Sequence, residues 1–140
     1  MEAGGQAGSP KNLVLILARE LASNVATPMF IVDAEGTLVF YNEPADAIIG
    51  RPFSQVGEMS GAEWGAMLQP ENLAGEKVSR MSVPPAIALF EQRPAHQKMQ
   101  ITGFDGQKRR LAITAFPLFA KADEFVGAVS IFWEENSEGE

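Results

Sequence analysis

The stretch MFIVDAEGTLVFYNEPADAIIG, residues 29–50, holds two β-rich runs joined by a turn and followed by helix signals. The runs at 29–33 and 37–41 are rich in valine, isoleucine, phenylalanine and threonine, which favour extended backbone. The intervening Asp-Ala-Glu-Gly supplies an aspartate that can bond the backbone ahead of it and a glycine that tolerates positive φ. We therefore expect a β-hairpin at this point of the chain.

Helix signals follow the hairpin directly. Asn42 can cap a helix, because its side-chain oxygen accepts a hydrogen bond from a free backbone amide. Pro44 suits the first turn, where its missing N–H is not needed, and Gly50 suits the left-handed residue that commonly ends a helix. The sequence therefore predicts a short helix between Asn42 and Gly50, laid over the sheet.

This order of apolar run, Asp-x-x-Gly, apolar run, asparagine, small helix and glycine resembles the start of a PAS domain. PAS domains are sensory and dimerisation modules of signalling proteins, and the resemblance covers roughly residues 24–134. It implies an α+β fold in which a five-stranded antiparallel sheet carries short helices on one face, with an additional N-terminal flanking helix.

The flanking helix is predicted because Leu13, Leu17 and Leu21 recur at a spacing of four residues. Other leucine and isoleucine residues widen the apolar surface beyond one stripe. This excess has two interpretations: the helix is tucked fully against its own sheet, or it has a second apolar face for another copy of the chain. The resemblance implies the second, since a helix flanking the first strand often dimerises in PAS proteins. Leu13, Leu17 and Leu21 are then the candidate dimer residues.

The middle of the chain carries further helix and loop signals. Ser60 and Glu63 match a capping box at the start of a short helix. Residues 69–81 are polar and contain proline and glycine, so we expect a loop that is a candidate lid. Another helix is expected to begin at Ser82, with two prolines tolerated in its first turn.

Three alternating stretches complete the predicted sheet, at residues 98–103, 109–118 and 125–133. The last of them is apolar on both faces, so one face is expected to cover a pocket and the other to meet the flanking helix or a partner. The chain is thus divided into a tail at 1–10, the flanking helix at 11–25, a PAS-like domain at 26–134 and an acidic tail at 135–140.

Composition excludes several kinds of site. The net charge of −7 disfavours nucleic-acid binding, which depends on basic side chains. The chain has no cysteine, so disulfides, cysteine metal sites and thiolate catalysis are excluded. The N-terminal residues lack the pattern of a signal peptide, and the apolar run near them is too short to span a membrane. We expect a cytoplasmic protein of one domain without a nucleic-acid or membrane partner.

Histidine, cysteine and the acidic residues bear on possible cofactors and on catalysis. His96 is the one imidazole that could ligate haem, but it follows Pro94 at the start of a predicted strand, whereas some haem-binding PAS domains carry the histidine on the long helix. Light-sensing flavin members of the family use a reactive cysteine, so that photochemistry is excluded, while non-covalent flavin stays open. The acids fall mainly in turns, helix starts and tails, which gives no positioned general acid or base. We expect no enzymatic activity and no metal site.

A ligand pocket between sheet and helices is the remaining candidate site. The same apolar residues would serve a filled core or a lined pocket, so both stay open. If a cavity exists, its lining favours an apolar or aromatic guest such as a fatty acyl chain. The candidate pocket residues are Val32, Val39, Ile49, Trp64, Met67, Phe90, Met99, Ile101, Ile113 and Val129.

We therefore expect a stand-alone PAS-like sensor that binds a small molecule, a protein partner or both, and relays its state through rearrangement of a homodimer. No output domain is recognisable in the sequence, so the signal would pass in trans to another signalling protein, or the chain is a fragment. The alternative is an adapter with a solid core that dimerises and binds no ligand. A small acid–base enzyme is a third interpretation, and it would need a carboxylate or His96 inside the cavity.

Overall fold

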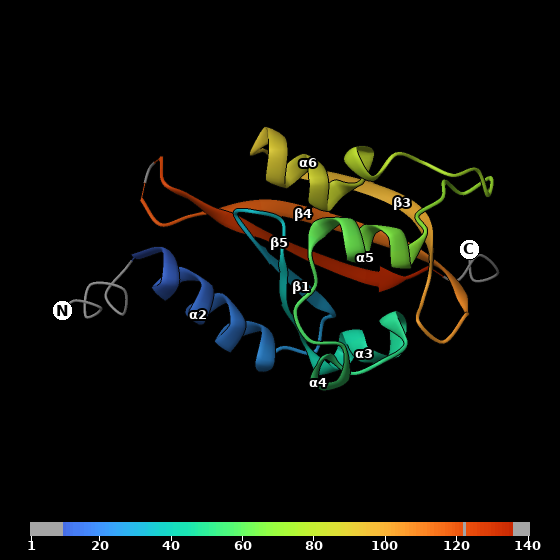
Figure 1. Cartoon of the computed structure of the whole chain (residues 1–140), viewed down its shortest axis with the longest axis horizontal. Coiled ribbons are helices and arrows are strands. Elements are labelled where there is room, and N and C mark those ends of the chain that lie inside the picture. Colours follow the sequence, from blue (N-terminus) through green and yellow to red (C-terminus); the bar gives the residue numbers. More distant parts are fainter. Residues whose placement is uncertain (1–9, 122, 136–140) are drawn as a thin grey trace.

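The computed structural model describes residues 10–121 and 123–135, and their central feature is a five-stranded antiparallel sheet (Figure 1). Its strand order is β2-β1-β5-β4-β3, so the last strand of the chain lies between the first and the fourth. Residues 1–9 of the predicted tail at 1–10 and residues 136–140 of the predicted acidic tail at 135–140 lie outside the described residues, and Pro10 is the first residue of α2. The elements in chain order are α2 (Pro10–Ser23), β1 (Met29–Asp33), β2 (Leu38–Tyr41), α3 (Glu43–Ile49), α4 (Phe53–Val56), α5 (Gly61–Leu68), η1 (Arg80–Ser82), α6 (Pro84–Glu91), β3 (Ala95–Thr102), β4 (Lys108–Phe119) and β5 (Phe125–Glu134).

The opening hairpin forms as the turn residues predict. The Asp33 carboxylate accepts hydrogen bonds from the backbone amides of Glu35 and Thr37, at 2.9 and 3.1 Å. Gly36 has a φ of 86°, in the left-handed region that glycine tolerates best. The predicted β-hairpin is therefore confirmed, with the second strand starting at Leu38.

Asn42 does more than cap α3. Its Oδ1 accepts from the amide of Ala45 in the first turn of α3, at 3.3 Å, and from the amide of Met29 at the start of β1, at 3.0 Å. Its Nδ2 donates to the carbonyl oxygens of Ala22 and Thr27, both at 2.9 Å. Asn42 is 1% exposed, so one buried side chain joins the end of α2, the linker after it, β1 and α3. At the other end of α3, Gly50 has a φ of 98°, which confirms the predicted cap.

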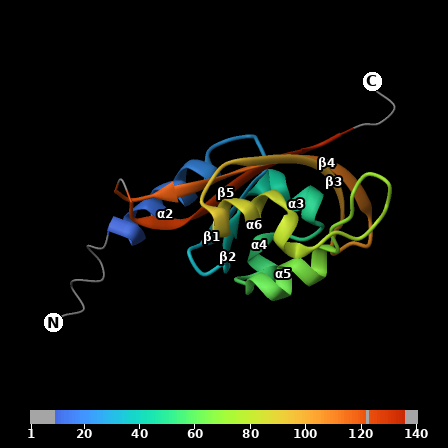
Figure 2. The ribbon, with the colours of Figure 1, turned by 90° about the horizontal axis from the view of Figure 1, so that it is seen from above.

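Each face of the sheet contributes to a separate hydrophobic core. Helices α3 and α6 pack with the side chains of one face, which include Phe30, Met99, Leu111 and Phe132. Helix α2 packs on the opposite face, as Figures 1 and 2 show from two directions. The α+β architecture predicted from the sequence, with short helices on one face and a flanking helix, is confirmed.

Several helix boundaries differ from the sequence-based expectation. Helix α6 begins at Pro84 and not at Ser82, because Val83 precedes a proline and takes an extended backbone, with φ −86° and ψ 155°. Ser82 instead ends the short helix η1. Residues 53–56 form the short helix α4, which was not predicted from the sequence. Helix α2 ends at Ser23, two residues before the predicted end.

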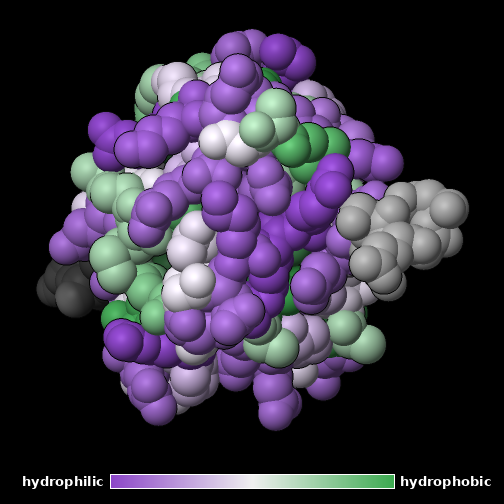
Figure 3. Space-filling view, turned by 90° about the vertical axis from the view of Figure 1, so that its right-hand side faces the viewer, coloured by the Kyte–Doolittle hydropathy of each residue, from purple (hydrophilic) through white to green (hydrophobic). Residues whose placement is uncertain are grey.

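One end of the molecule has a mainly polar surface. The end that faces right in Figure 1 is covered mainly by hydrophilic residues, with hydrophobic ones scattered among them (Figure 3). Among the residues that the structure describes, no helix is long and apolar enough to cross a membrane.

Candidate functional site

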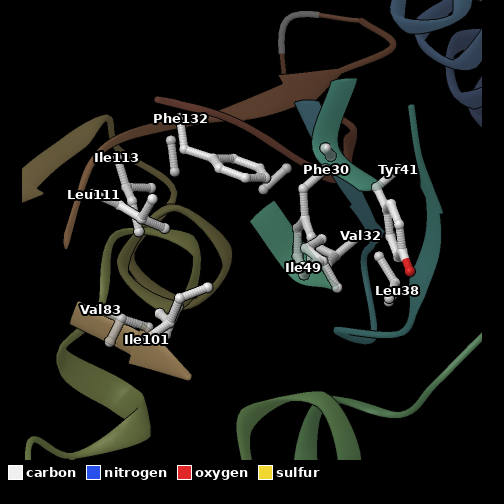
Figure 4. Close-up of a cluster of buried hydrophobic side chains, with 14 of the residues drawn as sticks. Phe30, Val32, Leu38, Tyr41, Ile49, Val83, Ile101, Leu111, Ile113 and Phe132 are labelled. Atoms are coloured by element: carbon white, nitrogen blue, oxygen red, sulfur yellow. The ribbon is translucent and has the colours of Figure 1, made fainter. Parts of the chain in front are cut away.

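A cavity of about 300 Å³ lies between the sheet and helices α5 and α6. Its sheet wall comes from four strands: Phe30 on β1, Met99 and Ile101 on β3, Leu111 and Ile113 on β4, and Phe132 on β5. In the close-up of the core, Phe132 lies between the group formed by Val83, Ile101, Leu111 and Ile113 and the group that contains Phe30 and Ile49 (Figure 4). The wall is thus continuous, apolar and partly aromatic.

Trp64 forms the wall that α5 contributes. A capping box fixes the start of this helix. The Ser60 hydroxyl oxygen accepts a hydrogen bond from the backbone amide of Glu63 at 3.2 Å, and the Glu63 carboxylate accepts one from the backbone amide of Ser60 at 2.9 Å. The indole N–H of Trp64 donates to the carbonyl oxygen of Gly36 at 3.0 Å, which ties α5 to the turn of the first hairpin. Its ring meets Phe30 edge to face, with centroids 5.0 Å apart. Trp64 is therefore fixed with its polar atom already bonded.

The cavity opens to solvent beside η1 and the end of α6. Met81 and Phe90 line the cavity and are nevertheless 56% and 60% exposed, so the cavity reaches solvent beside them. The side chain of Arg80 crosses this mouth: its stem lies on Gly65, where a Cβ atom would come within 2.7 Å of the Arg80 Cδ. Its Nη1 donates to the carbonyl oxygen of Ala62 at 3.3 Å. We call this arrangement the Arg80 strap.

A second clamp fixes the end of α3 beside the cavity. The guanidinium of Arg109 donates to both carboxylate oxygens of Asp105, at 2.8 and 3.2 Å, and to the carbonyl oxygen of Ile48 at 3.0 Å. The hydrogen bonds from Arg109 lower the pKa of Asp105 to about 2. The backbone amide of Phe104 also donates to Ile49, at 2.7 Å. The β3–β4 turn therefore holds Ile49, which lines the cavity, in place.

Buried polar side chains are few in the described part of the chain. They are Asn42 and Ser130, and Asn42 is saturated by the four hydrogen bonds described above. Ser130 is 3% exposed and lines the cavity from β5. Charged groups on the lining, Glu35 and Arg80, are exposed and lie at the rim.

The structure brings six of the ten candidate pocket residues to this cavity and places the other four elsewhere. Val32 belongs to the same core but does not line the cavity. Val39 and Val129 lie on the opposite face under α2, because strand alternation turns them away from the cavity. Met67 is 45% exposed, on the outer side of α5. The six that line the cavity are Ile49, Trp64, Phe90, Met99, Ile101 and Ile113.

Sequence reasoning missed most of the other lining residues, among them Phe30, Arg80, Ser130 and Phe132. For Ser130 a signal was present, since it is the single hydroxyl residue in the apolar strand FVGAVSIFW. For Arg80 there was none, because only the fold brings η1 against α5.

The candidate dimer residues lie together on one face of α2. Leu13, Leu17 and Leu21 are 53%, 58% and 59% exposed, and Ile16, which was not singled out from the sequence, extends the row. The opposite side of α2, with Leu15, Ala18 and Ala22, packs on the sheet. The helix therefore has two apolar faces, and one of them is uncovered in the monomer.

His96 lies away from the cavity. It is exposed on β3, and its Nδ1 is 2.7 Å from the hydroxyl oxygen of Thr114 on β4. Its ring neighbours Trp133, with centroids 6.4 Å apart. The described residues contain no cluster of three or more histidine or acidic side chains that could hold a metal ion.

Comparisons with known proteins were made by sequence and by structure. No family model matches the sequence, and no curated protein is significantly similar to it. The PAS domain of a protein from Colwellia psychrerythraea superposes with a TM-score of 0.64 at 15% identity, covering 89% of this chain and 98% of that one. The PAS domain of nitrogen regulation protein NR(II) from Vibrio parahaemolyticus gives a TM-score of 0.58 at 16% identity, with coverages of 85% and 98%.

The LOV protein of Rhodobacter sphaeroides is also similar, with a TM-score of 0.68 at 14% identity over 91% of this chain and 70% of that one. Identities this low concern the fold alone, and the three superpositions cover 85–91% of this chain. They agree with the five-stranded antiparallel sheet and the helices on one face that the sequence predicted. The chain therefore has the fold of a PAS domain.

Proposed function

We propose that the chain is a sensory module that takes a small apolar or aromatic molecule into its cavity and relays occupancy through a homodimer built on α2. The observation that carries the proposal is the cavity of about 300 Å³. Small-molecule sites occupy about 300–1,000 Å³ and are lined mainly by apolar side chains with a few polar groups. A filled core would leave no such space, because protein interiors contain few voids larger than a water molecule.

Strand β5 supports the relay, because it borders both the cavity and α2. Ser130 and Phe132 face the cavity, whereas Val129 and Ile131 pack under α2 on the other side of the sheet. A guest that displaces Phe132 moves the backbone that also carries Ile131. Occupancy therefore biases the position of α2, provided that the two positions differ in their affinity for the guest.

The uncovered face of α2 supports the homodimer. The exposed row at Leu13, Leu17 and Leu21 recurs at helical spacing, so the same row on a second copy could pack against it. The same row also favours the adapter, in which two copies join and nothing enters the cavity. In either case the state of the dimer would be read by another signalling protein, and no catalytic step is required.

Native mass spectrometry of the purified protein tests uptake. The native protein is expected to carry the extra mass of a bound molecule, which is lost on denaturation. This extra mass should be absent from the Ala86→Leu variant, because the larger side chain would occupy the cavity that Ala86 lines. The variant must keep the wild-type circular dichroism spectrum to serve as a control. Wild-type protein that stays bare after incubation with a panel of apolar and aromatic compounds would favour the adapter.

Light scattering on a sizing column tests the dimer. Replacing Leu17 and Leu21 together by glutamine should convert a dimer to a monomer, because the row loses its central apolar groups. Glu20→Gln, on the same helix, is the control and should leave the dimer intact. A double variant that remains dimeric at micromolar concentration would contradict the role of α2.

A further inference from the structure

Ser130 carries the one buried polar side chain that lines the cavity among the described residues. It is 3% exposed, and it takes part in none of the side-chain hydrogen bonds found among the described residues. Its side chain lines the cavity between Ala128 and Phe132, on the cavity face of β5. Buried hydroxyl groups are usually hydrogen-bonded, and an unpaired one is destabilising. A serine at this position therefore requires another explanation than stability.

The neighbours of Ser130 leave its hydroxyl group open to the cavity. Its partner on β4 is Ala115, whose methyl group carries no polar atom, and its partner on β1 is Phe30. Ala86 of α6 lines the same cavity and carries only a methyl group. None of these side chains can donate to the hydroxyl or accept from it, whereas a molecule in the cavity can.

The other polar groups along the cavity are already bonded or lie at the rim. The indole N–H of Trp64 is bonded to Gly36, and the guanidinium of Arg80 contacts Ala62 at the mouth. Glu35 is exposed at the edge of the lining. The interior thus offers a guest one uncommitted hydrogen-bonding group, and that group is uncharged.

We infer that Ser130 selects the guest: the cavity takes an uncharged, mainly apolar molecule that carries one hydrogen-bonding group on the end or edge that enters first. This inference rests on the proposed uptake of a small molecule. A serine hydroxyl donates and accepts, so a hydroxyl, carbonyl, amide or ring nitrogen can meet it. A carboxylate or ammonium group at this depth would be disfavoured, because no opposite charge lies in the interior to compensate for its desolvation.

Two probes of the same shape test this selection: para-cresol, which has a hydroxyl group, and para-xylene, which has a methyl group in its place. Their affinities for wild type and for Ser130→Ala are measured by NMR titration of the protein amides. The ratio of the cresol affinity to the xylene affinity removes the difference in hydrophobicity between the probes. We expect that ratio to fall about three- to tenfold in Ser130→Ala, the size expected of one hydrogen bond.

Ile113→Val is the matched control, because Ile113 lines the same cavity and carries no polar atom. This substitution should change the affinities for both probes by the same factor and leave their ratio unchanged. The thermal midpoint of ligand-free Ser130→Ala should equal or exceed that of wild type, because an unpaired buried hydroxyl group is removed. A folded Ser130→Ala protein with a wild-type ratio overturns the inference and leaves the proposed uptake intact. If wild type binds neither probe, the proposed uptake fails for guests of this size, and the inference fails with it.

Discussion

The substitution Asn42→Ala should strongly destabilise the protein. It removes all four hydrogen bonds through which Asn42 joins α2, β1 and α3. A hydrogen bond contributes about 1 kcal/mol net, and more when its loss leaves a buried group unpaired. The amide of Ala45 keeps a contact with the Asn42 carbonyl oxygen at 3.0 Å, so that bond is only partly lost. The expected decrease in the free energy of unfolding is therefore about 3–4 kcal/mol.

A decrease of this size is a large part of the stability of an ordinary domain, which is about 5–15 kcal/mol. Urea denaturation followed by circular dichroism measures it. Asn42→Ser should recover about 1 kcal/mol, because serine caps a helix as well as asparagine does but is too short to reach the carbonyl groups of Ala22 and Thr27. The serine variant therefore separates the cap of α3 from the connection to α2.

Asn24→Ala is the matched control. Its side chain makes one exposed hydrogen bond, from Nδ2 to the carbonyl oxygen of Glu20 at 2.8 Å, so its loss should cost less than about 1 kcal/mol. Hydrogen exchange adds a local measurement, since the amides at the end of α2 should exchange faster in both Asn42 variants. If Asn42→Ala and Asn24→Ala lower the stability equally, the buried asparagine is not the joint between the flanking helix and the core.

Three other substitutions probe the sheet, the clamp and the mouth. Gly127→Ala should lower the free energy of unfolding, measured in urea, by about 3 kcal/mol, because its Cβ would overlap a backbone carbonyl oxygen of β1. A loss below about 1 kcal/mol would contradict this close approach of β5 to β1. The pKa of Asp105 is lowered to about 2 by Arg109, so the stability that this carboxylate contributes is present above about pH 4 and is lost as the pH falls towards 2. The unfolding midpoints of wild type and Asp105→Asn should therefore differ near neutral pH and converge in acid, and a constant difference would contradict the ion pair. Gly65→Ala should displace the Arg80 strap and speed the release of a bound probe in NMR exchange measurements, whereas an unchanged release rate would mean that the strap does not gate the mouth.

Local chemistry explains why the first third of the fold was predictable. Asp33, Asn42 and Gly50 each act on backbone groups within a few residues, so their roles are legible in the sequence. Ser60 and Glu63 are predictable for the same reason. The start of α6 was misplaced because a serine that could cap a helix competed with Val83, whose backbone the following proline restricts. Where two local signals conflict, the steric one prevailed.

The cavity was less predictable, because it depends on which face of each strand turns inward. Val129 and Ser130 are neighbours on a strand with two apolar faces, and the alternation alone gives no preference. The pairing of Ser130 with Phe30 settles the face, and that pairing joins residues a hundred positions apart. The volume of the cavity also depends on how the sheet and helices pack together, since a lined cavity and a filled core require the same apolar side chains.

The two apolar faces of β5 also bear on the proposed relay. A strand between two apolar layers must bury both of its faces, so its side chains contact the cavity and the flanking helix in alternation. Phe132 faces the cavity, and its neighbour Ile131 faces α2 on the other side of the sheet. Only the thickness of one strand therefore separates the cavity from the α2 layer. Neither a chain of intermediate side chains nor a hinge is then needed between a guest and α2. The face of α2 that remains uncovered lies opposite the one that β5 supports, so a displacement of β5 reaches the proposed dimer contact through a single helix.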